Sequence, residues 1–75
     1  MSFANEANPD AWSAAVAEAD PDTILELAGQ WAVVRDRDPQ TATLIATSIG
    51  AVVARRESAG TVHPEVADRF FETLQ

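Results

Sequence analysis

The sequence contains no cysteine and no lysine, and it has a single histidine, His63. Without cysteine the chain forms neither a disulfide nor a thiolate zinc site, and one histidine cannot build a multi-histidine metal site. A chain of 75 residues also buries a smaller share of its surface than a larger protein does. Its stability must therefore come from side-chain packing, within the chain or across subunits.

Motifs for catalysis and for ligand binding are also absent. The sequence lacks a glycine-rich nucleotide loop, a P-loop, a His-Glu-x-x-His motif, an EF-hand and a Gly-x-Ser-x-Gly motif. His63 stands directly before a proline, where a turn or capping role accounts for it better than acid–base chemistry does. We therefore predict no enzyme activity, no catalytic residue, no cofactor and no bound metal. A small-molecule carrier with a pocket between the tryptophans is disfavoured for the same reason.

The acidic residues are concentrated in the first half of the chain. The net charge is −7, from twelve acidic residues and five arginines. Residues 1–34 carry six acids and no basic residue, which makes −6, whereas residues 35–75 carry six acids and all five arginines, which makes −1. Such a field repels nucleic-acid phosphates and favours either solubility or a basic partner surface. The candidate acidic face comprises Asp10, Glu18, Asp20, Asp22 and Glu26.

The longest charge-free stretch, residues 39–54, is too short and too polar to cross a bilayer. Its sixteen residues include Gln40, Ser48 and three threonines, and a membrane helix needs about 20 mainly apolar residues. We interpret this stretch as a buried helix. The N-terminal sequence lacks a basic region followed by an apolar stretch, so we expect no secretory signal and predict a cytoplasmic protein.

At four positions in the sequence, a capping residue stands directly before a proline. Proline suits the first helical position because its missing N–H has no partner there, and the preceding side chain can accept from the exposed amides. The unequal spacing of these four pairs argues against a structural repeat. The four capping residues are Asn8, Asp20, Asp38 and His63, and the predicted helices cover residues 9–19, 21–35, 39–59 and 64–74.

Two glycines and the N-terminal residues give further information on where the helices and the domain begin and end. Gly60 follows the third predicted helix, where a left-handed residue often closes the last turn. Gly29 lies inside the second and suggests either close helix packing or a slight bend. Residues 1–7 are predicted to be a flexible tail with Phe3 as its one possible anchor, and residues 8–75 to be a single helical domain.

These elements predict an all-α fold, a compact four-helix bundle of short helices around a central long helix at about residues 39–59. Each helix carries an apolar stripe with the 3.6-residue period of an amphipathic helix. The predicted core consists of Trp12, Val16, Ile24, Leu25, Leu27, Trp31, Val34, Ile45, Ile49, Val52, Val53, Val66, Phe70, Phe71 and Leu74.

The central helix has a second uncharged face besides the branched one that belongs to the core. Small residues on this face would let another backbone approach closely, so we expect helix 9–19, helix 21–35 or a second copy of the chain to pack there. Val33 and Leu44 are predicted to point outward, which adds to the expectation of a homodimer. The candidate interaction residues are Val33, Thr43, Ala46, Thr47, Gly50 and Ala54.

The sequence thus favours a small acidic protein–protein interaction module without catalysis, which binds a protein partner and self-associates. An alternative is an acidic decoy or inhibitor that binds the basic surface of a nucleic-acid-binding protein. A helix-turn-helix-like regulator is less well supported, because the acidic balance and the sparse arginines disfavour nucleic-acid binding. Arg55 and Arg56 could contact a phosphate, or could complement the carbonyl end of their own helix.

Overall fold

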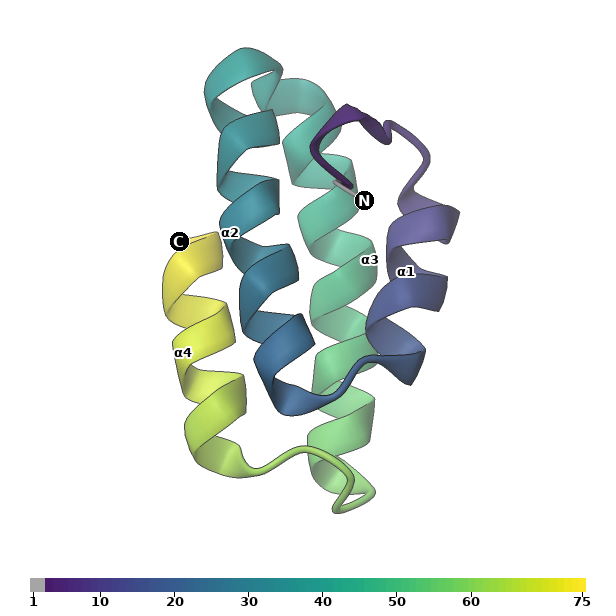
Figure 1. The fold of residues 1–75 in the computed structure, drawn as a ribbon, viewed down its shortest axis with the longest axis vertical. Helices are drawn as coiled ribbons and strands as arrows, with labels where there is room; N and C mark the ends of the chain where they lie inside the picture. The colour runs from purple at the N-terminus through teal and green to yellow at the C-terminus, as the bar shows by residue number, and fades with distance from the viewer. Residues whose placement is uncertain (1–2) are drawn as a thin grey trace.

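The computed structural model describes residues 3–75 as four α-helices preceded by one short 3₁₀ helix. These are η1 (Phe3–Asn5), α1 (Pro9–Glu18), α2 (Pro21–Arg37), α3 (Pro39–Ser58) and α4 (Pro64–Leu74). The α-helices alternate in direction, with α2 and α3 as a central pair, α1 on one side and α4 on the other (Figure 1). The predicted all-α four-helix bundle is confirmed, and α3, twenty residues long, packs against each of the other three.

Each α-helix begins with the capping residue and proline that the sequence indicates. In each case the side chain before the proline accepts a hydrogen bond from a backbone N–H of the first turn. His63 accepts through Nδ1 and is therefore the cap of α4, the local role that its position predicts. The acceptor-to-donor pairs are Asn8 with Asp10 at 3.0 Å, Asp20 with Thr23 at 2.8 Å, Asp38 with Thr41 at 3.3 Å, and His63 with Glu65 at 3.1 Å.

The ends of α2 and α3 differ in how they are closed. Gly60 has φ +80°, and the N–H groups of Gly60 and Thr61 donate to the carbonyls of Glu57 and Arg56 at 3.1 and 2.9 Å, the Schellman arrangement. In contrast, α2 continues to Arg37, two residues past the predicted end. Asp38 alone then connects α2 to α3, as the last cap of one helix and the first cap of the next.

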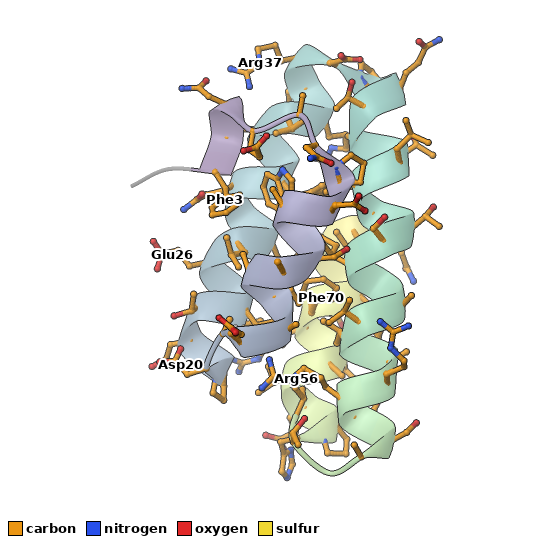
Figure 2. All side chains as sticks on the ribbon, turned by 90° about the vertical axis from the view of Figure 1, so that its right-hand side faces the viewer. Phe3, Asp20, Glu26, Arg37, Arg56 and Phe70 are labelled. Atoms are coloured by element: carbon orange, nitrogen blue, oxygen red, sulfur yellow. The ribbon has the colours of Figure 1, made fainter. Side chains whose placement is uncertain are left out.

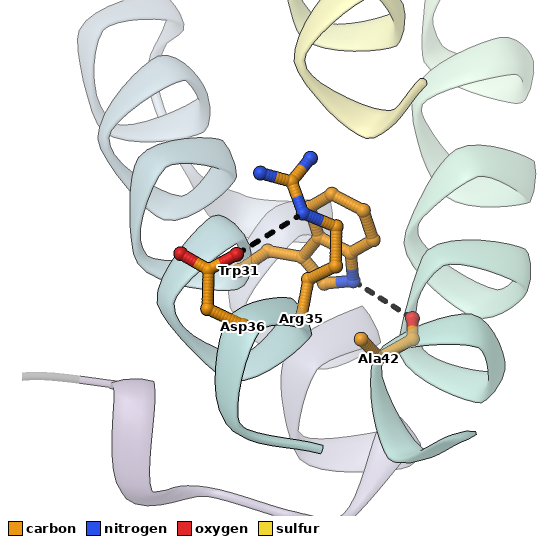
Figure 3. Close-up of polar contacts among 4 residues, drawn as sticks. All are labelled: Trp31, Arg35, Asp36 and Ala42. Atoms are coloured by element: carbon orange, nitrogen blue, oxygen red, sulfur yellow. Dashed lines mark hydrogen bonds and ion pairs between the residues drawn. The ribbon is translucent and has the colours of Figure 1, made fainter. Parts of the chain in front are cut away.

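The core lies between the two central helices and extends toward α1 and α4. Trp31 of α2 reaches α3, where its Nε1–H donates to the carbonyl of Ala42 at 2.7 Å (Figure 3). The guanidinium of Arg35 covers the Trp31 ring at 5.4 Å from its centroid and pairs with Asp36 at 3.7 Å. Buried residues are Trp12, Val16, Ala19, Ile24, Leu27, Ala28, Trp31, Val34, Ala42, Ile45, Ile49, Val52, Val53, Val62, Ala67 and Phe70.

Most of the predicted core residues are buried, and the differences concentrate on one edge of the bundle. Leu25, Val66, Phe71 and Leu74 pack against the core but stay partly exposed. Three of these belong to α4, which lies at one side of the bundle, and Leu25 belongs to α2. An outer helix buries only the stripe of side chains that faces its neighbours. Val62, in the loop before α4, is buried although helical periodicity does not include it.

The N-terminal segment differs from the predicted flexible tail in its described part. Phe3 packs edge-on against Trp12 with ring centroids 5.3 Å apart, and the indole N–H of Trp12 donates to the carbonyl of Glu6 at 2.8 Å. Arg37, at the end of α2, donates to the carbonyl of Ala4 and to the side chain of Asn5. Residues 3–6 therefore lie against α1 and α2, and residues 1 and 2 are outside the described part of the chain.

Candidate protein-binding surfaces

The small-residue face of α3 is partly covered, and the helix that covers it is α4. A Cβ atom built on Gly50 would lie 3.6 Å from Cε1 of Phe71, and Ala46 packs against the core. The expectation that α1, α2 or a second copy fills this position is therefore wrong at Gly50. Thr43, Thr47 and Ala54 remain exposed, so the structure divides the candidate interaction residues between a packed group and a free group.

A different stripe of residues on α3 is exposed to solvent along the length of the helix. We call it the outer seam of α3, and its members are Gln40, Leu44, Thr47, Ala51, Ala54 and Ser58, all of them exposed. Leu44 is 63% exposed, the largest value among the large hydrophobic residues. The alternating steps of four and three residues follow the heptad spacing by which two helices meet along one line. Sequence reasoning missed Ala51 and the register of this stripe, although the seven-residue intervals were present in the sequence.

The hydroxyl of Thr47, a member of the outer seam, and that of Thr43, which lies outside the seam, both have hydrogen-bond partners within the helix. The hydroxyl of Thr47 donates to the carbonyl of Thr43 at 3.1 Å, and that of Thr43 donates to the carbonyl of Pro39 at 2.9 Å. Each hydroxyl thus already has a partner four residues back. Covering Thr47 with another apolar surface would therefore not leave its hydroxyl without a hydrogen bond.

Val33 is the other exposed large hydrophobic residue, at 50%, and it belongs to α2. Its neighbours one helical turn away include Gly29, Asp36 and Arg37, all exposed. Charged side chains therefore lie next to Val33 on its C-terminal side, whereas Leu44 lies in an uncharged stretch. Val33 and Leu44, which the sequence predicted to point outward, are thus both exposed but have different surroundings.

An open groove of about 400 Å³ lies between α1 and α2. We call it the α1/α2 groove. Its apolar wall comes from both helices and from η1, and its charged residues are all acidic: Glu18, Asp20 and Glu26. Figure 2 shows Phe3, Glu26 and Asp20 following one another along one edge of the molecule. The lining consists of Phe3, Ala15, Glu18, Ala19, Asp20, Thr23, Glu26, Leu27 and Gln30.

The candidate acidic face is therefore only partly assembled into one site. Asp10 and Asp22 are exposed and do not line the groove. Asp10 is in the first turn of α1, about 12 Å along the helix from Glu18 at 1.5 Å per residue. Hydrogen bonding by Thr23, first through its side chain and then through its backbone N–H, holds the pKa of Asp20 below its ordinary value. Asp20 thus remains ionised at neutral pH while it caps α2.

Arg56 does not project freely from the end of α3. Its Nη1 donates to the carbonyls of Val16 and Ala19 at 2.7 and 2.8 Å, and its Nε donates to Oγ1 of Thr61 at 3.2 Å. A cation is favourable beside the carbonyl end of a helix. The sequence suggested this role for Arg56 at its own helix, and the structure places the guanidinium at the end of α1 instead.

No protein-family model matches this chain, and comparison with curated proteins and with solved structures finds no significant similarity. Among residues 3–75, no group of three or more histidine, cysteine, aspartate or glutamate residues is placed so that it could hold a metal ion. In the same range, none of the helices has both the length and the apolar character that crossing a membrane requires. The two surfaces that stand out are the outer seam of α3 and the α1/α2 groove.

Proposed function

We propose that the chain is a non-catalytic protein–protein interaction module that forms a homodimer through the outer seam of α3. The observation that carries this proposal is the 63% exposure of Leu44 on a helix face without charge from residue 40 to residue 54. A leucine so placed exposes apolar surface, and burial of a leucine side chain contributes about 1.5 to 3 kcal/mol. A second copy of the chain provides that burial twice, once for each Leu44.

The seam is also complementary to itself. Leu44 and Ala54 lie five residues on either side of Ile49, and Thr47 and Ala51 lie two residues on either side. A two-fold axis through the middle of α3 would therefore pair Leu44 of each copy with Ala54 of the other, in an antiparallel helix pair. The small residues at one end leave space for the leucine from the opposite end, so the two helices can approach closely.

The dimer is tested by light scattering coupled to size-exclusion chromatography, with the wild type and two matched variants. We expect a dimer at micromolar concentration, a monomer for Leu44→Glu, and a dimer for Val33→Glu. Both variants place one carboxylate at an exposed apolar position, but only the first places it in the seam. A monomeric wild type, or loss of the dimer in Val33→Glu alone, would contradict the proposal. Circular dichroism shows whether each variant stays folded.

Substitutions at Gly50 are less suitable for this experiment. A leucine at Gly50 would extend beyond the Cβ position that is already 3.6 Å from Phe71, so its effect on packing within one chain would obscure its effect on the dimer. Seam residues avoid this difficulty because their side chains point to solvent. For the compartment we propose the cytoplasm, on the sequence pattern described above.

A further inference from the structure

We propose that the α1/α2 groove is a second binding site, which takes an arginine- or lysine-bearing segment of another protein. This inference goes beyond self-association, because the groove is formed by η1, α1 and α2 and the dimer seam by α3. Three observations on the groove support it: the sign of its charges, the apolar wall beside them, and its size.

The charges of the groove are all negative, and no side-chain ion pair with another of residues 3–75 neutralises them. Within the described part of the chain, the charged residues that line it are Glu18, Asp20 and Glu26. Among residues 3–75, the one ion pair between side chains joins Arg35 to Asp36. Arg56, at the end of α1, is occupied by two backbone carbonyls. A cationic side chain that entered the groove would therefore meet three carboxylates without displacing a basic side chain of residues 3–75.

The apolar wall selects a cation with an aliphatic stem rather than a bare ion. Phe3, Ala15, Ala19 and Leu27 line the groove next to the carboxylates. Arginine and lysine pack their methylene stems against apolar surface while the charged head stays at the polar edge. The volume of about 400 Å³ lies at the lower end of the range of ligand pockets. A short segment that carries one or two basic side chains matches this volume.

Two other roles would use the same acidic residues. A solvated acidic face that only keeps the protein soluble predicts no saturable binding. A decoy for a basic nucleic-acid-binding surface would use carboxylates over the whole first half, including Asp10 and Asp22, which lie outside the groove. The groove proposal differs from both because it assigns the binding to Glu18, Asp20 and Glu26 together with their apolar neighbours.

The test uses a fluorescein-labelled peptide of alternating arginine and leucine, and a matched peptide with citrulline in place of arginine. Citrulline keeps the shape of arginine and removes its charge. We expect saturable binding of the arginine peptide in fluorescence anisotropy, weakening as salt is raised, and little binding of the citrulline peptide. In ¹⁵N-labelled protein, the amide shifts caused by the arginine peptide should concentrate at Ala15, Ala19, Thr23 and Leu27.

Matched variants locate the binding on the protein. The pair Glu18→Gln and Glu26→Gln should weaken binding about fivefold, as expected for the loss of two exposed charge pairs. The pair Asp68→Asn and Glu72→Gln removes the same charge from exposed positions on α4 and should leave binding unchanged. Equal weakening by both pairs, equal binding of the citrulline peptide, or no saturable binding would overturn the proposal. Repeating the titration in Leu44→Glu makes the result independent of the dimer.

Discussion

Arg56 and Ala19 connect two helices that are separated by the whole of α2 in the sequence. Nη1 of Arg56 donates to the carbonyl of Ala19 at 2.8 Å, and the same nitrogen donates to the carbonyl of Val16 at 2.7 Å. Helix α1 has only ten residues, and isolated helices of that length are marginal in water. The guanidinium therefore stabilises the end of the shortest α-helix by satisfying carbonyls that have no partner within it.

Replacing Arg56 by glutamine is expected to lower the free energy of unfolding by about 2 kcal/mol, because hydrogen bonds to charged groups contribute about 1.5 to 3 kcal/mol. Urea denaturation followed by circular dichroism measures the change. Arg55→Gln is the matched control, since it removes the same charge from the adjacent exposed position and should alter the stability by less than about 0.5 kcal/mol. Equal effects of the two substitutions would show that the contact with α1 is not what matters.

The same glycine-to-alanine change is expected to act in opposite directions at two positions. Gly60→Ala should destabilise the protein by about 1 to 2 kcal/mol, because Gly60 has φ +80° and a side chain is unfavourable there. Gly29→Ala should stabilise it by up to about 1 kcal/mol, because Gly29 is exposed within α2 and a Cβ there would meet nothing within 4 Å. Thermal or urea unfolding compares the two, and the same sign for both would contradict this assignment.

The geometry at Gly29 also excludes close helix packing, one of the two reasons that the sequence suggested for a glycine there. No atom outside its own helix backbone and chain neighbours comes within 4 Å of the Cβ position, so close helix packing is not the reason for a glycine there. A stabilising Gly29→Ala substitution would confirm that the helix tolerates a side chain at this point.

Phe3→Ala is expected to reduce the stability by about 2 kcal/mol, because Phe3 is partly buried against Trp12 and aromatic pairs add to the transfer free energy of the ring. The fluorescence maximum of the protein should shift to longer wavelength as Trp12 becomes hydrated. Phe3→Leu, which keeps an apolar side chain, should lose less than half as much stability. If Phe3→Ala changes neither stability nor fluorescence, residues 3–6 behave in solution as the flexible tail that the sequence suggested.

The capping carboxylates of Asp20 and Asp38 are expected to make the free energy of unfolding decrease at acidic pH. Hydrogen bonding by Thr41, mainly through its side chain and then through its backbone N–H, lowers the pKa of Asp38 below 3.8, and Thr23 does the same for Asp20. Because the folded pKa is the lower one, each carboxylate contributes stability that is fully present above pH 3.8 and is lost as the pH falls through the folded pKa.

Urea unfolding between neutral pH and pH 2 measures this loss, and asparagine variants isolate it. Asp20→Asn and Asp38→Asn keep a capping oxygen but do not titrate, so each variant should lose less stability on acidification than the wild type does. The double variant should lose the least. An unchanged pH dependence in the double variant would show that other carboxylates determine the acid sensitivity.

Local sequence was sufficient to predict where the helices begin and where most of them end. Asn8, Asp20, Asp38 and His63 cap their helices through atoms within three residues of the boundary, so the signal is contained in a short stretch of chain. The end of α2 was predicted two residues early, because the alternating charges after Val34 resemble a solvated turn as well as they resemble a last helical turn.

The candidate sites could be predicted only in part. The acidic character of the first half is a property of composition, but the groove exists because α1 and α2 place Glu18, Asp20 and Glu26 around one hollow. Arg56 was recognised as a helix-end cation, yet its partner carbonyls belong to α1, which lies nearly forty residues earlier. Contacts of this range depend on how helices pack, and periodicity within one helix does not contain that information.

The charge-free stretch at residues 39–54 shows what the sequence determines and what depends on the tertiary structure. The sequence by itself determined that it is a helix, that its branched face is buried, and that a second face is uncharged. Only the tertiary structure decided that Phe71 of α4 covers Gly50 and that Leu44 stays exposed. The physical reason is that neighbouring uncharged faces of a helix look alike in a hydropathy pattern, and the position of the adjacent helix determines which of them meets solvent.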